Sequence, residues 1–226
     1  MILPASGLFA LPAGADPQQL SMLAINPPTA ALLLSEFVDL KPGEWVVQNS
    51  ANSSVARWVI AFAKARGLKT VNIVRRPELV AELKAIGGDV VVVDSPNASK
   101  EVKAAVGQDG LRLALDGVSG PATGVIASTL SAHGTLVSFA AMSAAPISIS
   151  PLDVIFKPIT IRGFWLGHPE FAAKSAPAIA EAAEMIASGK VHIPVAATYA
   201  LSSIKEAVAH AQRGGKILLD VAGSST

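Results

Sequence analysis

The stretch WVVQNSANSSVARWVIAFAKARGLKTVNIVRR, residues 45–76, decides the fold. It begins with an apolar run, passes through a turn of small polar residues, and continues with apolar residues at helical spacing as far as Gly67. A second strand is expected over Thr70–Val74, and Arg75 and Arg76 follow it. This order of strand, turn, helix and strand is typical of half of a dinucleotide-binding fold.

The two arginines bear on the cofactor that such a unit would bind. In a βαβ unit the first turn offers backbone N–H groups and a helix N-terminus to a pyrophosphate, and the residue after the second strand meets the adenosine ribose. An acidic side chain there would hydrogen-bond a ribose 2′-hydroxyl, whereas Arg75 and Arg76 could pair bidentately with a 2′-phosphate. The sequence therefore favours NADP over NAD.

The turn itself lacks the Gly-x-Gly-x-x-Gly pattern, because Asn, Ser and Ala fill positions 49–54 and 56. Small side chains still allow close approach of the backbone, Asn tolerates left-handed conformations, and Ser or Asn can cap the helix. From the pattern alone, an ordinary βαβ turn without a ligand is an equal alternative.

Composition excludes several classes of function. Among 226 residues, 18 basic and 17 acidic side chains leave no field to hold nucleic acid or an anionic membrane. Charged residues make up 15% of the chain, against about a quarter in typical soluble domains. We therefore expect much of the surface to be covered by a doubly buried sheet, a subunit partner, or a missing part of the polypeptide. The absence of cysteine excludes disulfides, thiol nucleophiles and cysteine zinc sites.

No membrane span or signal peptide is expected. Residues 117–152 carry no charge, but glycines, prolines and serines interrupt them. The N-terminus has no basic region before its first prolines, so a bacterial-type cytoplasmic protein is expected.

Beyond Arg76, strands and helices alternate without a long linker. Apolar strands that alternate with helices predict an α/β fold, a doubly wound parallel Rossmann sheet, with a partial second lobe from the C-terminal tail. A helical pattern over Asp16–Asp39 is interrupted at two prolines, after which Thr29 could cap the second half. The other elements are expected at Pro77–Ile86, Ala98–Val106, Gly120–Ala132, Phe171–Ser188 and Ser203–Gln212 for helices, and at Val90–Val93, Leu111–Leu115, Thr135–Ala140, Ile159–Leu166, Val195–Tyr199 and Lys216–Val221 for strands.

Several segments in a fixed order carry a family resemblance. INPPTAALLL precedes the opening stretch, and LALDGVSG, GTLVSFAAM, ITIRGFWL and KILLDV follow it. Together they resemble the medium-chain dehydrogenase/reductase superfamily, most closely its NADPH-dependent 2-enoyl thioester reductases of fatty acid metabolism. The resemblance covers nearly the entire chain.

The resemblance implies an NADP(H) site. Four positions depart from the family's usual glycines, and the added Cβ atoms of Ser54, Ala56, Ala140 and Ala141 could narrow that site. By position, Asn26 would contact the nicotinamide end; Asn52, Ser53, Ser54 and Val55 the pyrophosphate; Arg75 and Arg76 the 2′-phosphate; Phe139, Ala140, Ala141 and Met142 the nicotinamide; Phe164, Trp165, Leu166 and Gly167 the nicotinamide and substrate pocket; and Lys216 the cofactor from the tail.

The same resemblance implies a domain plan. Residues 1–25 would be the remnant of a GroES-like catalytic lobe, residues 26–189 the Rossmann domain, and residues 190–226 a segment of the catalytic lobe. Because family members carry about a hundred residues before the Rossmann domain, we expect the N-terminal lobe to be missing from this chain. A homodimer is expected.

The implied reaction is hydride transfer to the β-carbon of a 2-enoyl thioester, with the proton donor a tyrosine of the missing lobe. Tyr199 is read as structural, and Trp165 as a core aromatic from the pattern but a pocket wall from the resemblance. His133, His168, His192 and His210 lack metal-site spacing, so a zinc-independent enzyme is expected.

Three alternatives remain open from the sequence. One is a quinone or enone reductase of the same superfamily, and another is a non-catalytic nucleotide-binding module. A domain that binds S-adenosylmethionine is the third, and the arginines after the second strand argue against it, since that place usually carries an acid.

Overall fold

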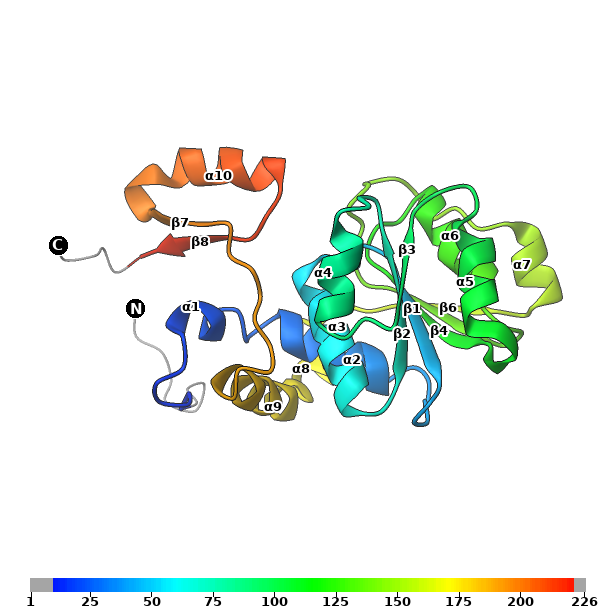
Figure 1. Ribbon diagram of the computed structural model, residues 1–226, viewed down its shortest axis with the longest axis horizontal. Coiled ribbons are helices and arrows are strands. Elements are labelled where there is room, and N and C mark those ends of the chain that lie inside the picture. Colours follow the sequence, from blue (N-terminus) through cyan, green and yellow to red (C-terminus); the bar gives the residue numbers. More distant parts are fainter. Residues whose placement is uncertain (1–9, 222–226) are drawn as a thin grey trace. The chain divides into compact units, whose positions relative to one another are not determined.

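The computed structural model describes residues 10–221, which form two compact units. The larger unit, Ala24–Glu181, is a six-stranded parallel sheet with helices on both faces (Figure 1). Its strand order, β3-β2-β1-β4-β5-β6, is that of a Rossmann fold, which confirms the expected doubly wound α/β architecture. The strands are β1 (Trp45–Gln48), β2 (Lys69–Val74), β3 (Val90–Val93), β4 (Leu111–Asp116), β5 (Thr135–Ser138) and β6 (Thr160–Gly163).

The helices cover the sheet in two layers. On one face α3 and α4 bury apolar side chains against β2, and α2 packs on α3; on the other, α5 and α6 pack against β1, β4 and β5 (Figure 1). Both faces are therefore apolar, as a parallel sheet requires. The helices that begin in this unit are α2 (Asn26–Ser35), α3 (Ser54–Ala65), α4 (Leu79–Ala85), α5 (Ala98–Val106), α6 (Pro121–Thr129), α7 (Pro151–Phe156), α8 (Pro169–Ala172) and α9 (Ser175–Ala187), with a 3₁₀ turn at Gly107–Asp109. The last turns of α9 belong to the second unit.

The start of α2 differs from the expectation. The helix begins at Asn26 with both prolines in its first turn, so Thr29 lies inside it and does not cap it. The Thr29 N–H donates to the Ile25 carbonyl oxygen at 3.1 Å. Because proline carries no N–H, the first turn has fewer donors to satisfy and needs no side-chain cap.

Two further helical segments differ from the sequence pattern. The helix expected over Phe171–Ser188 is split into α8 and α9, because Pro177 is tolerated only near a helix start. Helix α7 was not expected, although Ser150 accepts a hydrogen bond from the Leu152 N–H at 3.3 Å and Pro151 occupies the first position. A serine followed by proline is an ordinary start signal that the sequence reading missed.

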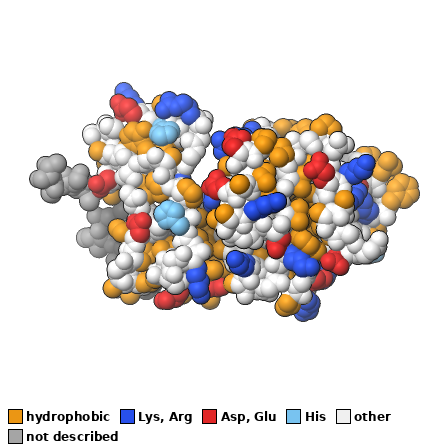
Figure 2. Space-filling model, viewed as in Figure 1, with side chains coloured by type: hydrophobic (Ala, Val, Ile, Leu, Met, Phe, Trp, Pro, Cys, Tyr) orange, Lys and Arg blue, Asp and Glu red, His pale blue; other side chains and the backbone are white. Residues whose placement is uncertain are grey.

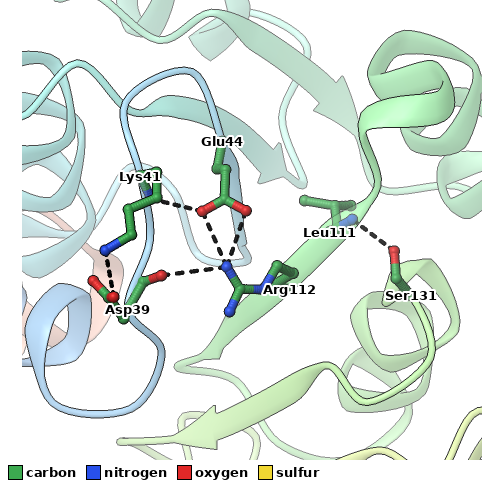
Figure 3. Close-up of polar contacts among 6 residues, drawn as sticks. All are labelled: Asp39, Lys41, Glu44, Leu111, Arg112 and Ser131. Atoms are coloured by element: carbon green, nitrogen blue, oxygen red, sulfur yellow. Dashed lines mark hydrogen bonds and ion pairs between the residues drawn. The ribbon is translucent and has the colours of Figure 1, made fainter.

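At the amino end of the sheet, one extra residue sits in β4. Trp45 lies opposite Leu111 and Val46 opposite Leu113, so Arg112 is left out of register. Its Nη1 donates to the two Glu44 carboxylate oxygens at 3.0 and 3.1 Å (Figure 3). The Lys41 backbone N–H and then Arg112 hold the pKa of the Glu44 carboxyl below its usual value. This pair links the residue before β1 to the extra residue of β4.

At the carboxyl end, a buried polar network joins β1 to β4, the point where the strand order reverses. The Asn49 side chain donates from Nδ2 to Asp116 Oδ1 at 2.7 Å and accepts at Oδ1 from the Gly117 N–H at 2.8 Å. Asp116 is fully buried and receives three more hydrogen bonds. Their donors are the Val118 N–H and Ser119 N–H, each at 3.0 Å, and the Thr123 hydroxyl at 2.5 Å. We call this set, Asn49, Asp116, Gly117, Val118, Ser119 and Thr123, the switch-point clip.

The smaller unit contains residues 10–23 and 182–221. Its parallel strands β7 (Ala197–Ala200) and β8 (Ile217–Asp220) are joined through a 3₁₀ turn at Leu201–Ser203 and α10 (Ile204–Arg213). The short helix α1 (Pro17–Leu20) is tied in by Gln19, whose buried amide exchanges two hydrogen bonds with the Ile193 backbone at 2.8 and 2.9 Å. The assignment of this unit to a catalytic lobe stays a prediction.

Asp116→Ala should lower the free energy of unfolding by on the order of 3–5 kcal/mol, because it leaves several buried donors without an acceptor. Asp116→Asn should cost less than half as much, since its amide oxygen can keep the three Oδ1 bonds while its NH₂ donates to the Thr123 hydroxyl. Urea unfolding followed by circular dichroism measures both. Equal losses for the two variants would contradict this account of the clip.

Candidate functional site

The loops at the carboxyl ends of the strands form the candidate site. In an open α/β sheet, ligands bind outside these ends where the strand order reverses, here between β1 and β4. The segments that converge are the turn after β1, the arginine pair after β2, and the loops after β4, β5 and β6.

The turn after β1 offers free hydrogen-bond donors. Ser50 adopts a left-handed backbone conformation with φ 47°, and its carbonyl oxygen accepts from the Ser53 N–H at 2.9 Å. The Ser53 hydroxyl caps α3 by accepting from the Ala56 N–H at 3.2 Å. Within residues 10–221, the backbone N–H groups of Asn52, Ser54 and Val55 have no acceptor. Free N–H groups at a helix N-terminus attract an anion, so the turn can hold a phosphate.

The arginine pair follows β2 on the surface. Arg75 is exposed and makes no ion pair or hydrogen bond with the described residues. The Arg76 Nε lies 3.7 Å from Glu78 Oε1, and both of these side chains are largely exposed. An ion pair this open to water contributes little, so both guanidinium groups are available to a ligand.

The loop after β5 lies against the loop after β4. The Phe139 N–H donates to the Asp116 carbonyl oxygen at 3.0 Å, and the Ser143 N–H donates to the Val118 carbonyl oxygen at 2.9 Å. Met142 is 69% exposed, and its sulfur accepts from the Ser50 hydroxyl at 3.4 Å. Phe139–Met142 and the turn after β1 are thus brought together at the reversal point.

The four positions without the family's glycines fall into two groups. Ala140 and Ala141 are exposed, so their methyl groups lie on the surface of the loop. Ala56 is fully buried in α3, where its carbonyl oxygen accepts from Gln48 Nε2 at 3.0 Å. Its methyl group is accommodated in the core, and only Ser54 adds a partly exposed side chain to the turn.

After β6, two adjacent aromatic residues behave differently. Phe164 is 7% exposed and packs against Phe37 and Phe171, with ring centroids 6.1 and 4.7 Å away. Its side chain therefore anchors the loop after β6 in the core. Trp165 is 71% exposed, and a Cβ added at Gly167 would lie 2.4 Å from its indole Cζ2. The exposed indole, which lies close to Gly167, is not a core aromatic, and its role as a pocket wall stays a prediction.

Two predicted cofactor residues lie outside these loops. Asn26 is half-buried at the start of α2, and its side-chain amide has no partner within residues 10–221. Lys216 belongs to the smaller unit, where its carbonyl oxygen accepts from the Ala196 N–H at 2.8 Å. The cofactor contacts of both residues stay predictions.

Three polar residues of this region were missed as individual site residues. Asn49 and Asp116 build the switch-point clip, and Arg57 hydrogen-bonds the turn from inside α3. A lone aspartate that ends an apolar strand was a usable signal for Asp116. Arg57 gave none, because an arginine in an amphipathic helix usually faces solvent.

The donor set for a metal is sparse. Within residues 10–221 no group of three His, Asp or Glu side chains is placed to hold a metal ion. In the same part of the chain, no helix has both the length and the apolar character needed to cross a membrane.

Residues 54–184 match the family model described as zinc-binding dehydrogenase. A mitochondrial enoyl-acyl-carrier-protein reductase of Dictyostelium discoideum is 39% identical over 164 residues, which are 70% of this chain and 47% of that protein. The corresponding protein of Caenorhabditis elegans is 40% identical over 148 residues, 64% of this chain and 42% of its own. The chain thus spans about half the length of these relatives.

Solved structures agree in fold. A mitochondrial 2-enoyl thioester reductase heterodimer from Candida tropicalis superposes with a TM-score of 0.82 at 25% identity, covering 95% of this chain and 64% of that one. The complex of Etr1p with NADP and crotonyl-CoA gives 0.80 at 25% identity over 89% of this chain and 61% of that one. A putative quinone reductase from Bacillus thuringiensis, 19% identical with a TM-score of 0.87 over 97% of this chain and 69% of its own, shows the fold alone. The chain belongs to the zinc-binding dehydrogenase family of the medium-chain dehydrogenase/reductase superfamily.

Proposed function

We propose that this chain is the NADPH-binding portion of an oxidoreductase that reduces the C=C bond of 2-enoyl thioesters. The observation that carries the proposal is the pairing of a free helix N-terminus after β1 with two available arginines after β2. The relatives named enoyl-acyl-carrier-protein reductase support the substrate class.

The residues present fit NADPH in three places. The N–H groups of Asn52, Ser54 and Val55 would bind the pyrophosphate, with Ser53 holding the turn through its cap. Arg75 and Arg76 would bind the 2′-phosphate, because a guanidinium matches its geometry bidentately. The list of proposed nicotinamide and substrate neighbours is Asn26, Phe139, Ala140, Ala141, Met142, Phe164, Trp165, Leu166, Gly167 and, from the smaller unit, Lys216.

The roles of these residues are binding, orientation and exclusion of water. NADPH, when bound, supplies the hydride. Met142 and Trp165 present exposed apolar surface from the loops after β5 and β6, which would keep water from the reacting carbon. We assign no proton donor: the Tyr199 hydroxyl is 2.8 Å from His210 Nδ1 within the smaller unit, a contact that suits a structural role.

A quinone or enone reductase is the second candidate. Putative quinone reductases share the fold, but at 19–24% identity they carry no argument about substrate. The relatives at 39% and 40% identity favour an enoyl thioester.

The zinc of the family description does not fit this chain. It has no cysteine, and within residues 10–221 no three other metal-ligating side chains come together. We therefore derive no step through a metal.

A second copy of the chain is the proposed partner. Within the described residues β6 pairs only with β5, and all four of its residues are exposed, which leaves an open edge that favours strand pairing. Beside it in sequence, α7 exposes Leu152, Ile155 and Phe156 at 61, 65 and 75%. Figure 2 shows hydrophobic side chains gathered at the end of the Ala24–Glu181 unit where α7 lies. The heterodimer of the related Candida tropicalis reductase supports association.

The NADPH proposal predicts that the wild-type chain binds NADPH more tightly than NADH. Arg75→Gln should raise the Kd for NADPH on the order of tenfold or more and leave the Kd for NADH unchanged, because only NADPH carries the 2′-phosphate. Quenching of tryptophan fluorescence measures both affinities. Arg112→Gln, at the amino end of the sheet, is the matched control and should change neither Kd. Equal affinity of the wild type for the two cofactors would overturn the 2′-phosphate assignment.

The substrate proposal is tested by turnover of the chain as given. With NADPH and crotonyl-thioester or a quinone, we expect no turnover, because the proton donor is assigned to no described residue. The same chain joined to a related N-terminal lobe should oxidise NADPH with the thioester in preference to the quinone. Preference for the quinone would support the second candidate, and turnover by the 226 residues alone would show that they contain a proton donor.

Association is tested by sedimentation equilibrium. We expect a dimer at micromolar concentration, and Phe156→Ser should weaken it on the order of tenfold, because it places a hydroxyl in an apolar contact. Leu201→Ser removes an exposed apolar side chain from the smaller unit and should leave association unchanged. A wild-type monomer would contradict the proposal.

A further inference from the structure

The turn that faces the proposed pyrophosphate lacks glycine, so its shape must come from other contacts. A carbonyl oxygen aimed into the same space as the free N–H groups would repel a phosphate, since both carry negative charge. The nearest such group in sequence is the carbonyl of Asn52, which precedes the cap residue Ser53. That carbonyl is not left open, because the Arg57 Nε donates to it at 3.3 Å.

Arg57 itself is unusual in its burial. Its side chain is 8% exposed although it lies only in the fourth position of α3, beside the turn. A buried guanidinium without a partner is costly, and here Glu82 of α4 supplies the partner through an ion pair between Nη2 and Oε1. The Glu82 side chain is 42% exposed, so a partly exposed carboxylate of α4 contacts the buried arginine.

These two contacts form a chain from α4 to the turn. Glu82 fixes the Arg57 guanidinium, and Arg57 in turn fixes the Asn52 carbonyl oxygen. Helix α4 begins at Leu79, directly after the segment that contains Arg75 and Arg76. One ion pair, buried on its Arg57 side, therefore links α3 next to the turn with α4, the helix that follows the arginine segment.

We propose that Arg57 and Glu82 are positioning residues that hold the glycine-free turn in its anion-binding shape, with Arg57 turning the Asn52 carbonyl away from the pyrophosphate. Arg57 does not bind the cofactor itself, because both of its assigned contacts are inside the protein and its side chain is buried. The inference rests on the proposed NADPH function.

A purely structural role for the pair would give a different result. If Arg57 and Glu82 only fastened α4 to α3, their loss would disturb the arginine loop before α4 at least as much as the turn. Two probes distinguish the two roles: one contains a pyrophosphate but no 2′-phosphate, and the other contains a 2′-phosphate but no pyrophosphate. ADP-ribose is the first probe, and adenosine 2′-monophosphate is the second.

The experiment measures binding of both probes by calorimetry to the full chain. Arg57→Met keeps an unbranched side chain but removes the two donors, Nε and Nη2, that make these contacts. The variant should raise the Kd for ADP-ribose on the order of tenfold and change the Kd for adenosine 2′-monophosphate by less than about twofold. Arg75→Gln should show the opposite pattern. In Arg57→Met the Kd values for NADPH and NADH should rise by the same factor, because both cofactors contain the pyrophosphate.

Arg66→Met is the matched control. Arg66 lies at the other end of the same helix, donates to the Ala31 carbonyl oxygen at 3.3 Å and pairs with Glu181 at 3.7 Å, yet it is remote in sequence from the turn. Its loss should change neither probe's affinity. The Tm of each variant is measured first, so that binding is compared at a temperature at which every variant is folded.

Unchanged ADP-ribose affinity in Arg57→Met, or equal weakening of both probes, overturns the inference. If Arg57→Met fails to fold, Glu82→Gln decides, since it keeps the Nε bond but removes the ion-pair partner; it should weaken ADP-ribose several-fold and spare the other probe, and no change overturns the inference. A wild-type chain that binds neither probe nor NADPH overturns the proposed function as well, whereas tight wild-type binding with an unaffected Arg57→Met removes the positioning role alone.

Discussion

The fully buried carboxylate of Asp116 is the constraint on which the rest of the candidate site depends. It accepts four hydrogen bonds and joins the ends of β1 and β4 where the sheet reverses its strand order. Because Asn49 both donates to it and accepts from Gly117, the two loops cannot move apart without leaving buried polar groups unpaired. The loop after β5 is then added through backbone bonds to the same segment. One side chain thus sets the spacing of three loops.

The βαβ unit and the parallel sheet could be predicted from the sequence, since apolar runs such as Val90–Val93 and the helical spacing after Ser53 are local patterns. The strand lengths and the division into α8 and α9 depend on proline chemistry and tertiary packing, which periodicity reports poorly. Phe164 and Trp165 make the same point at the site: adjacent aromatics look alike in sequence, yet one is core and the other is surface. The roles of Asn49 and Arg57 lie in long-range contacts, so local sequence patterns could not assign them.

The turn after β1 takes its shape without the glycines of the usual fingerprint. Ser50 takes the left-handed conformation, Ala56 places its methyl group in the core, and Ser53 supplies the cap. In each case a side chain or its contacts set a local geometry that glycine would only allow. Backbone N–H groups of the turn thereby stay without acceptors within residues 10–221, although the glycine pattern is absent.

The ion pair between Arg57 and Glu82 also has a consequence for variation among related sequences. Position 82 is on the surface of α4, where substitutions are ordinarily close to neutral, but it balances a charge that is sealed inside the protein. A neutral residue at position 57 would leave position 82 with no buried charge to balance, whereas an arginine there needs an acidic partner. The two positions, 25 apart in the chain, should therefore change together across the lineage.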